Sequence, residues 1–215
     1  SPYETIVATE RSFAAIDQNG RVSTFGFSIQ GGDSSTVAAD LSTGIVAVVP
    51  NFDAFAAINT GGGVITWGQA PNGGDSSTVA AFLASGVDEV VGGDQAFAAI
   101  KRGGSGGATE VASWGSTAVV GNFQTVSAAL TNVETIVANS RAFAALTQDG
   151  SVIAWGDANN GGDISSVAEN LTSNVIVSVF GSEAGTAFVA VTSTGQAIAW
   201  GDQGSGGMLP AAAAE

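Results

Sequence analysis

The stretch AFAALTQDGSVIAWGDANNGGDISSVAENL, residues Ala142–Leu171, decides the fold because its pattern recurs along nearly the whole chain of 215 residues. It opens with a Phe-led apolar tetrad, passes through a Gly-containing turn to a Trp–Gly pair, and ends with Gly–Gly–Asp and a Leu. The tetrads begin at Phe13, Phe55, Phe97, Phe143 and Phe188. Their spacing of 42 to 46 residues defines five repeats, and such a period is typical of propellers, solenoids and arrays.

An aromatic–Gly pair follows each Phe after 12 to 17 residues. The pairs are Phe25–Gly26, Trp67–Gly68, Trp114–Gly115, Trp155–Gly156 and Trp200–Gly201. All four tryptophans therefore occupy one slot of the repeat. This regularity favours a core position, with an exposed carbohydrate-binding platform as the alternative.

The first part of each repeat predicts three short strands. Glu4–Ala8 and Glu134–Ala138 share the sequence ETIVA, whose β-branched residues favour a strand. The tetrad predicts the second strand, and Gln148–Gly150 predicts a tight hairpin turn in which Gly supplies positive φ. Apolar residues occupy both alternating faces of the later strands, so we expect both faces of each sheet to be covered.

A polar loop and a Gly–Gly–Asp segment follow the aromatic–Gly pair, and the nine residues GGDSSTVAA are identical at 31–39 and 73–81. Asp or Asn at this point predicts an N-cap whose side chain accepts backbone N–H bonds from the first helical turn. The predicted caps are Asp33, Asp75, Asn122 and Asp163. Val and Leu four residues apart, as at Val167 and Leu171, predict a helix of about two turns.

These elements predict a mainly β fold: a five-bladed, propeller-like ring of three-stranded antiparallel sheets with a short helix per repeat. An open β-solenoid-like arc is the alternative. The repeats form one domain and run approximately over residues 1–41, 42–83, 84–130, 131–171 and 172–215. Open solenoids need polar capping repeats, whereas this chain starts in an apolar strand around Ile6. We therefore expect the first and fifth repeats to meet, and Leu209–Pro210 to begin a fifth helix.

Composition excludes several classes of function. Five Lys+Arg against 19 Asp+Glu give a net charge of −14, which cannot neutralise a nucleic-acid backbone. Apolar runs such as Ile45–Pro50 are far shorter than the roughly 18 residues of a membrane span, so we expect a soluble chain that does not span a membrane. There is no Cys for a disulfide framework. A first residue of Ser1 fits a mature chain whose targeting segment has been removed.

The run AFAALTQDGSVIAWGD and its equivalents resemble the regulator of chromosome condensation repeat, in which an apolar strand, an Asp–Gly turn and a strand ending in Trp–Gly recur in a seven-bladed propeller. The resemblance covers all five repeats. This chain differs in its repeat number, in a GGDSS segment with a helix in place of Gly–Gln–Leu–Gly, and in lacking His in the tetrad strand. The family's functions include nucleotide exchange on a small GTPase with chromatin binding, and inhibition of a β-lactamase by a secreted member. The charge contradicts chromatin binding, and no residue matches an exchange function.

The residues predict no catalytic, metal or cofactor site. Gly103–Gly107 fits G-x-S-x-G, but a nucleophile elbow needs a His base, and the chain has no His. Asp157, Asn159 and Asp163 are spaced like part of a calcium loop without its closing acidic residue, which favours capping. The sequon Asn170–Thr172 contains an expected core Leu, which argues against glycosylation.

Two insertions break the repeat, and we assign the candidate binding residues to them. Lys101–Glu110 lengthens the third hairpin, and the connection around Gly181–Thr186 is enlarged. Insertions in repeat proteins map to exposed loops and often to the binding face. The candidate partner-binding residues are Lys101, Arg102, Ser105, Glu110, Ser182 and Glu183.

We therefore expect a non-enzymatic repeat scaffold that binds a protein partner, as an accessory subunit of a larger assembly. The expected location is extracytoplasmic: secreted, at the cell surface or in an organelle lumen, including the periphery of a membrane complex. The alternative is a secreted or surface protein whose binding depends on carbohydrate or calcium. We expect no cofactor and no nucleic-acid partner.

Overall fold

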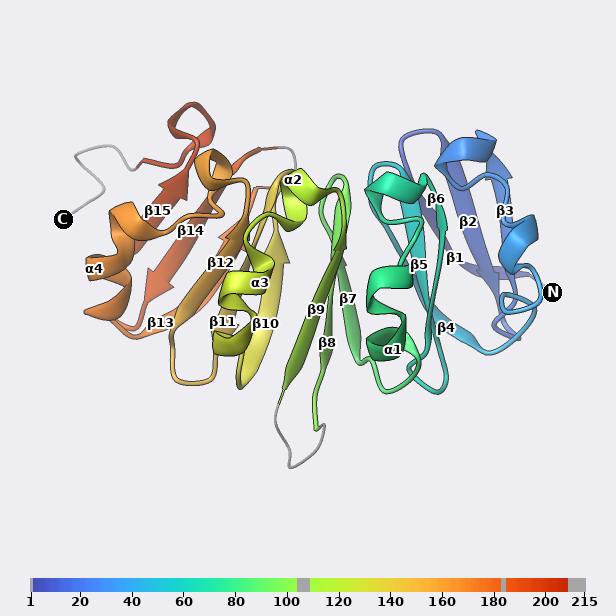
Figure 1. The fold of residues 1–215 in the computed structure, drawn as a ribbon, viewed down its shortest axis with the longest axis horizontal. Coiled ribbons are helices and arrows are strands. Elements are labelled where there is room, and N and C mark those ends of the chain that lie inside the picture. Colours follow the sequence, from blue (N-terminus) through green and yellow to red (C-terminus); the bar gives the residue numbers. More distant parts are fainter. Residues whose placement is uncertain (1, 104–108, 183–184, 209–215) are drawn as a thin grey trace. The chain divides into compact units, whose positions relative to one another are not determined.

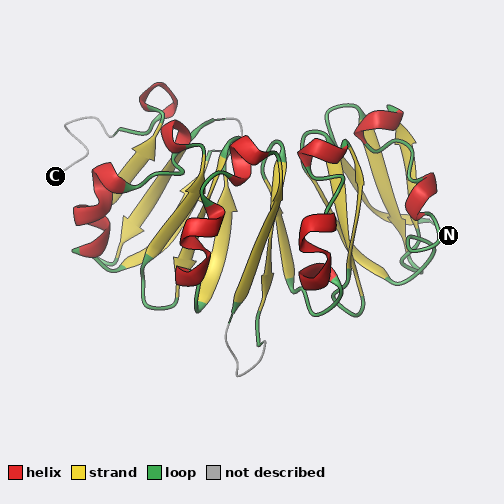
Figure 2. Cartoon of the chain, in the orientation of Figure 1, coloured by secondary structure: helices red, strands yellow, loops and turns green. Residues whose placement is uncertain are grey.

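The computed structural model describes residues 2–103, 109–182 and 185–208. The chain divides into two compact units: an N-terminal unit of Ser1–Gly104 with Ala112–Ser116, and a C-terminal unit of Ser105–Val111 with Thr117–Glu215. The strands form separate three-stranded sheets, with short helices beside them (Figures 1 and 2). The expected fifth helix at Leu209 lies outside the described residues.

Each sheet holds three consecutive strands in sequence order, and neighbouring strands are antiparallel. The sheets of the N-terminal unit are β1 (Tyr3–Ala8), β2 (Ser12–Asp17) and β3 (Val22–Gly26); β4 (Ile45–Pro50), β5 (Ala54–Asn59) and β6 (Val64–Gly68); and β7 (Glu89–Gly92), β8 (Ala96–Lys101) and β9 (Glu110–Gly115). Those of the C-terminal unit are β10 (Val133–Ala138), β11 (Ala142–Thr147) and β12 (Val152–Gly156); and β13 (Ile176–Gly181), β14 (Ala187–Thr192) and β15 (Ala197–Gly201).

Short helical segments follow the outer strand of each sheet. The α-helices are α1 (Ala80–Leu83), α2 (Thr117–Val120), α3 (Phe123–Val126) and α4 (Ala168–Thr172). The 3-10 turns are Ser28–Gln30, Ser35–Val37, Ala70–Asn72, Ser77–Val79, Ser127–Ala129, Ala158–Asn160, Ser165–Val167 and Gln203–Ser205. The predicted two-turn helix is thus a 3-10 turn continued by an α-helix in the second and fourth repeats.

Successive sheets within a unit pack through alternate faces of their tetrad strands. Ala14 and Ile16 of β2 share one buried cluster with Phe55 and Ala57 of β5. The opposite face of β5, which includes Ala54, belongs to the cluster of the third sheet. Both faces of this sheet are therefore covered, as the sequence predicts.

A Phe ring and a Gly make a close contact at a junction between repeats. Phe55 stacks on Trp67, with ring centres 5.2 Å apart, and lies against Gly31 of the preceding repeat, where an added Cβ would be 2.5 Å from the ring. The Trp67 indole N–H donates to the Gly31 carbonyl over 3.0 Å. Equivalent hydrogen bonds of 3.1 Å join Trp114 to Gly73 and Trp200 to Gly161. The four tryptophans are at most 3% exposed, which confirms the core interpretation and excludes an exposed platform.

Three of the predicted caps bind the first turn of their helical segment. Asp33 Oδ1 accepts the backbone N–H of Ser35 at 2.9 Å. The same carboxylate-to-backbone bond joins Asp75 to Ser77 at 2.9 Å and Asp163 to Ser165 at 2.8 Å.

The cap predicted at Asn122 is wrong. Asn122 precedes α3 but makes no side-chain cap bond, and its Oδ1 instead accepts the N–H of Gly156 at 3.2 Å. The reason is the extra helix α2 in this repeat. It leads into Gly121, which lies directly against the Gly156 backbone, so the neighbouring Asn122 side chain reaches Gly156 rather than its own helix.

We expect Gly31→Ala to destabilise the N-terminal unit more than Gly206→Ala destabilises the C-terminal unit. Both glycines are left-handed, with φ of 94° and 97°, so each substitution costs about 1–2 kcal/mol in backbone strain. Only the Cβ at position 31 would meet a ring, that of Phe55, while nothing lies within 4 Å at Gly206; overpacking adds about 1–3 kcal/mol. Equal losses in urea titrations would contradict the Phe–Gly contact.

We expect Phe143→Ala to lower the free energy of unfolding by about 3–5 kcal/mol, through lost burial and the cavity that remains. Phe143 is fully buried and stacks on Trp155, with ring centres 5.4 Å apart. Asp163→Ala removes the two turn-capping hydrogen bonds from the Ser165 N–H and hydroxyl and should cost about 1 kcal/mol. Similar midpoints for the two variants in a denaturant titration would show that one of these assignments fails.

Candidate protein-binding site

The base of the third hairpin places two of the candidate residues, Lys101 and Arg102, at the end of β8. The Lys101 ammonium lies 4.5 Å from the centre of the Phe82 ring. Arg102 Nη2 is 2.6 Å from Glu89 Oε2, and the Arg102 backbone N–H donates to the Asp88 carboxylate. Both cations therefore have partners within the chain, so a second protein would compete with or extend these contacts.

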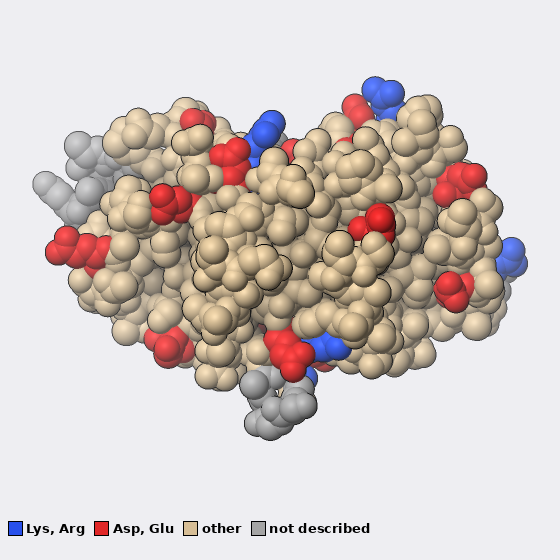
Figure 3. Space-filling view, in the orientation of Figure 1, with Lys and Arg blue, Asp and Glu red and all other residues tan. Residues whose placement is uncertain are grey.

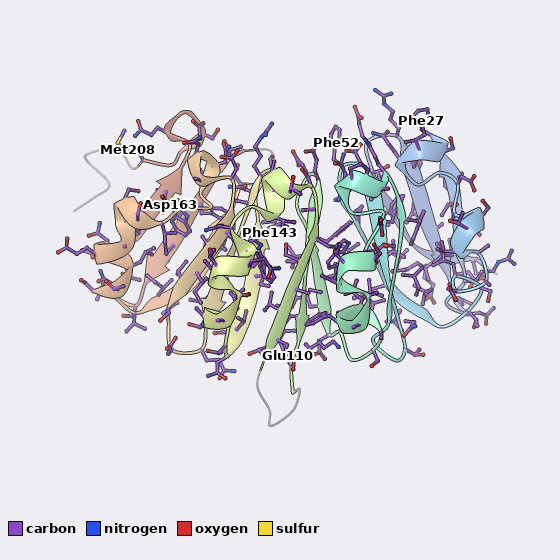
Figure 4. The ribbon with its side chains drawn as sticks, viewed as in Figure 1. Phe27, Phe52, Glu110, Phe143, Asp163 and Met208 are labelled. Atoms are coloured by element: carbon purple, nitrogen blue, oxygen red, sulfur yellow. The ribbon has the colours of Figure 1, made fainter. Side chains whose placement is uncertain are left out.

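The far side of the same hairpin starts at Glu110, the first residue of β9, which is exposed. Figure 4 shows Glu110 at the end of its strand. Ser105 lies outside the described residues. Acidic side chains are scattered over the visible surface, and some of them lie directly beside this hairpin (Figure 3).

The second insertion connects β13 to β14. Ser182 is exposed, and its backbone N–H donates to the Ala187 carbonyl at 3.1 Å. The Gly185 carbonyl accepts the N–H of Ser140, in the β10–β11 turn, also at 3.1 Å. Glu183 lies outside the described residues. The enlarged turn is thus tied to the neighbouring repeat of the C-terminal unit by a backbone hydrogen bond.

The two insertions occupy different positions within the repeat. Residues 101–110 join the second and third strands of their sheet, whereas residues 181–187 join the first and second strands of theirs. In an antiparallel sheet these connections lie at opposite ends of the strands. The candidate residues therefore belong to two non-equivalent edges of the repeat.

A buried polar cluster that the sequence analysis missed links the first two repeats. Asp53 is 5% exposed, and its carboxylate accepts from Gln30 Nε2 at 2.5 Å and from Asn72 Nδ2 at 2.7 Å. Asn51 Nδ2 donates to the Asn72 carbonyl at 2.6 Å. The signal available in the sequence is that Asp53 stands where the other repeats have Arg, Gln or Thr. The cluster ties two loops of the N-terminal unit together.

Two exposed aromatic side chains at the loop ends of the N-terminal unit also escaped the sequence analysis. Phe27 and Phe52 are each 46% exposed and are labelled in Figure 4. Phe52 stands where the other repeats have Glu10, Asp94, Ser140 or Gly185, and Phe27 stands where they have polar residues. Repeat differences of this kind change a surface without changing the length of the chain.

The carboxylates of the calcium-like spacing serve as turn caps. Asp157 Oδ1 accepts the N–H of Asn159 at 2.9 Å, and Asp163 binds Ser165 as described above. Within residues 2–103, 109–182 and 185–208, no three His, Cys, Asp or Glu side chains come close enough together to hold a metal ion. The Leu171 side chain of the sequon is buried, as predicted.

Backbone hydrogen bonds lower the pKa of several turn carboxyls. The Ser35 N–H holds the pKa of Asp33 below its ordinary value of 3.8, and the Ser77 N–H does the same to the pKa of Asp75. Backbone donors also lower the pKa of Asp17, and the Thr147 hydroxyl lowers that of Asp149. The lowered pKa values are thus explained by turn geometry.

Of the helices in the described ranges, none has both the length and the apolar character needed to cross a membrane.

The arrangement of sheets is found in solved structures, although no protein-family model and no curated protein matches the chain. Prp20p from Saccharomyces cerevisiae shares 18% of its residues, with a TM-score of 0.56 over 93% of this chain and 58% of Prp20p. Yeast RCC1 (Prp20) bound to Kap60 shares 17% sequence identity, with a TM-score of 0.54 over 92% of this chain and 55% of the RCC1 chain. The ectodomain of the Physcomitrella patens receptor kinase CR4 shares 14% sequence identity, with a TM-score of 0.56 over 93% of this chain and 50% of the ectodomain.

These similarities establish the fold and leave the activity open. The five three-stranded sheets have the fold of RCC1-like propeller repeats, which confirms the predicted fold class and the resemblance. The chain spans between 50% and 63% of the length of the propeller chains it resembles. Closure of the first repeat onto the fifth stays a prediction, as does the organisation into one domain.

We expect the double variant Asp33→Asn with Asp75→Asn to lose less stability on acidification than the wild type. A pKa lowered by folding contributes stability that is present above the unfolded value of 3.8 and is lost as the pH falls through the folded pKa. Asn keeps the accepting oxygen but does not titrate. The melting temperature, followed by circular dichroism between about pH 5 and pH 2, should therefore fall less steeply in the variant; parallel curves would refute this origin of acid sensitivity.

Proposed function

We propose, from the premise that its sheets share the fold of RCC1-like propeller repeats, that this chain is a non-enzymatic scaffold that binds a protein partner. The proposal includes its place as an accessory subunit of a larger assembly outside the cytosol or in an organelle lumen, peripheral to any membrane. The fold similarity supports the coarser part, a protein-interaction scaffold.

One observation carries the proposal. The repeats have the same residues where sheets pack together, and they differ in the connections between strands. The Phe and Trp slots are buried in junctions, as at Phe55 and Trp67. The two insertions, at residues 101–110 and 181–187, fall in connections between strands. A partner that binds once must contact features that are not repeated five times, and the insertions are such features.

The solved structures of similar fold are consistent with this class of function. Yeast RCC1 is described as bound to Kap60, and Prp20p as binding Gsp1p and histones. In this chain the carboxyls with lowered pKa bind backbone N–H groups or hydroxyls in turns. They are held by structure rather than poised for proton transfer, which favours a scaffold over an enzyme.

We expect deletion of Gly103–Gly107 to leave the fold intact and weaken the complex. The shortened hairpin has the length of the other repeats, so circular dichroism and the melting curve should resemble those of the wild type. Recovery of the co-purifying partner from the native source, quantified by mass spectrometry, should fall about fivefold or more if the tip holds a binding hot spot.

A matched variant shortens the other insertion, the β13–β14 connection of residues 182–186, by two residues, to the length of the equivalent connections in the other repeats. Loss of the partner in either variant places the interface at that edge of the repeat. Unchanged recovery in both variants would overturn the assignment of the interface to the insertions.

A further inference from the structure

Three equivalent turns of the N-terminal unit place an exposed aromatic residue between two acidic ones. The turns join the first and second strands of successive sheets, and Glu10, Phe52 and Asp94 occupy the same slot in them. The Glu10 N–H donates to the Phe52 carbonyl at 3.1 Å, and the Phe52 N–H donates to the Asp94 carbonyl at 2.9 Å. These three residues, the turn row, therefore lie side by side at one end of the sheets.

Phe52 is exposed although both faces of its sheet are covered. Its side chain is 46% exposed, whereas the nearby Ala54 and Phe55 are fully buried on opposite faces of β5. The exposure of the ring therefore does not arise from a missing neighbouring sheet. The hydrogen bonds on both sides of Phe52 fix its backbone, so little conformational entropy is lost when a partner contacts it. Aromatic side chains are enriched in protein interfaces.

The side chains beside Phe52 offer more acceptors than donors. Asp53 is 5% exposed and Gln30 is 8% exposed. Gln30 Nε2 lies 2.5 Å from Asp53 Oδ1 and 3.4 Å from Glu10 Oε2, whereas its buried Oε1 has no hydrogen-bond partner among the described residues. A buried acceptor without a donor is costly. These groups favour a ligand that carries positive charge and only donates hydrogen bonds, as Arg and Lys side chains do.

Arg11 of the chain itself shows how a guanidinium fits this chemistry. Its Nε is 3.4 Å from Glu10 Oε2, and its Cζ lies 5.9 Å from the centre of the Phe27 ring. Figure 4 shows Phe27 at the same end of the N-terminal unit as Phe52. One guanidinium thus contacts a carboxylate and an aromatic ring at this loop end.

The carboxylates at this loop end outnumber that cation. Glu10, Asp53 and Asp94 bring three negative charges against the one positive charge of Arg11. A second guanidinium can stack on an aromatic face and bind a carboxylate through two N–H groups, which an ammonium cannot do. We propose that the turn row binds an arginine side chain from a basic segment of the protein partner, with the guanidinium on the Phe52 ring. This inference rests on the proposed function as a protein-binding scaffold and names the chemistry of the partner.

The test titrates the isotope-labelled full chain with a tripeptide that has arginine between two glycines and is blocked at both ends. Backbone amide signals are followed by NMR. The expected result is saturable shifts of the amides of Glu10, Phe52 and Asp94. A control tripeptide carries citrulline, which has nearly the shape of arginine without its charge, and should bind about fivefold more weakly or less.

Two variants separate the contribution of the ring from that of the carboxylates. Phe52→Leu keeps apolar bulk without an aromatic face and should weaken binding of the arginine tripeptide about threefold. Glu10→Gln with Asp94→Asn removes two charges and should weaken it about fivefold. The matched control, Glu4→Gln with Asp40→Asn, removes two exposed charges at the opposite ends of the strands and should leave binding unchanged. Circular dichroism checks that each variant folds.

The other outcomes overturn the proposal. Equal binding of the citrulline tripeptide, or equal weakening by the control pair, would show attraction by net charge alone. Unchanged binding in Phe52→Leu would remove the ring from the site, and the absence of saturable shifts at the turn row would remove the site itself. If such a result accompanies partner loss on deletion of Gly103–Gly107, the scaffold function stands and only this inference fails. If neither experiment detects binding, the proposed function fails with it.

Discussion

The absence of a side chain at one residue in each of three junctions is the constraint on which the packing of these repeats depends. Gly31, Gly73 and Gly161 each lie against a Phe ring of the following repeat, closer than any Cβ would permit. Their left-handed φ values also suit Gly, and their carbonyls accept the indole N–H of the adjoining Trp. The Gly–Phe contact and the Trp–Gly hydrogen bond hold the same two sheets together, so the Gly, the Phe and the Trp form one packing unit.

The sequence predicted the strands, the buried Phe and Trp slots and three turn caps because these features recur in repeat after repeat. Equivalents at regular positions in several repeats make an assignment such as Trp155 or Asp163 secure. The misses lie where a repeat is unique or carries no pattern. Asn122 follows a helix found in one repeat, which moves its side chain to Gly156. Segments such as Ala158–Asn160 form a 3-10 turn without an apolar period that would reveal it.

The candidate surfaces were less predictable because a repeat can change its surface residues without changing its length. Insertions are visible by counting, and they led to Lys101 and Arg102, whose existing contacts with Phe82 and Glu89 depend on the fold. Phe25 was assigned to its slot as an equivalent of Trp. Its exposure depends on whether another sheet lies beside it, which spacing along the chain does not encode. The burial of Asp53 likewise depends on two loops from different repeats meeting at its carboxylate.

The positions of the tryptophan side chains make their fluorescence a probe of the junctions between repeats. Trp67 and Trp114 are each buried at a junction of the N-terminal unit and Trp200 at one of the C-terminal unit, each hydrogen-bonded to a single carbonyl. Separation of two sheets would expose one indole to water and red-shift its emission, while the emission of the other tryptophans would stay unchanged. The first sheet has Phe25 in the corresponding slot. Fluctuations confined to its outer face are therefore invisible in tryptophan emission, which makes native fluorescence a selective reporter of the junctions between repeats.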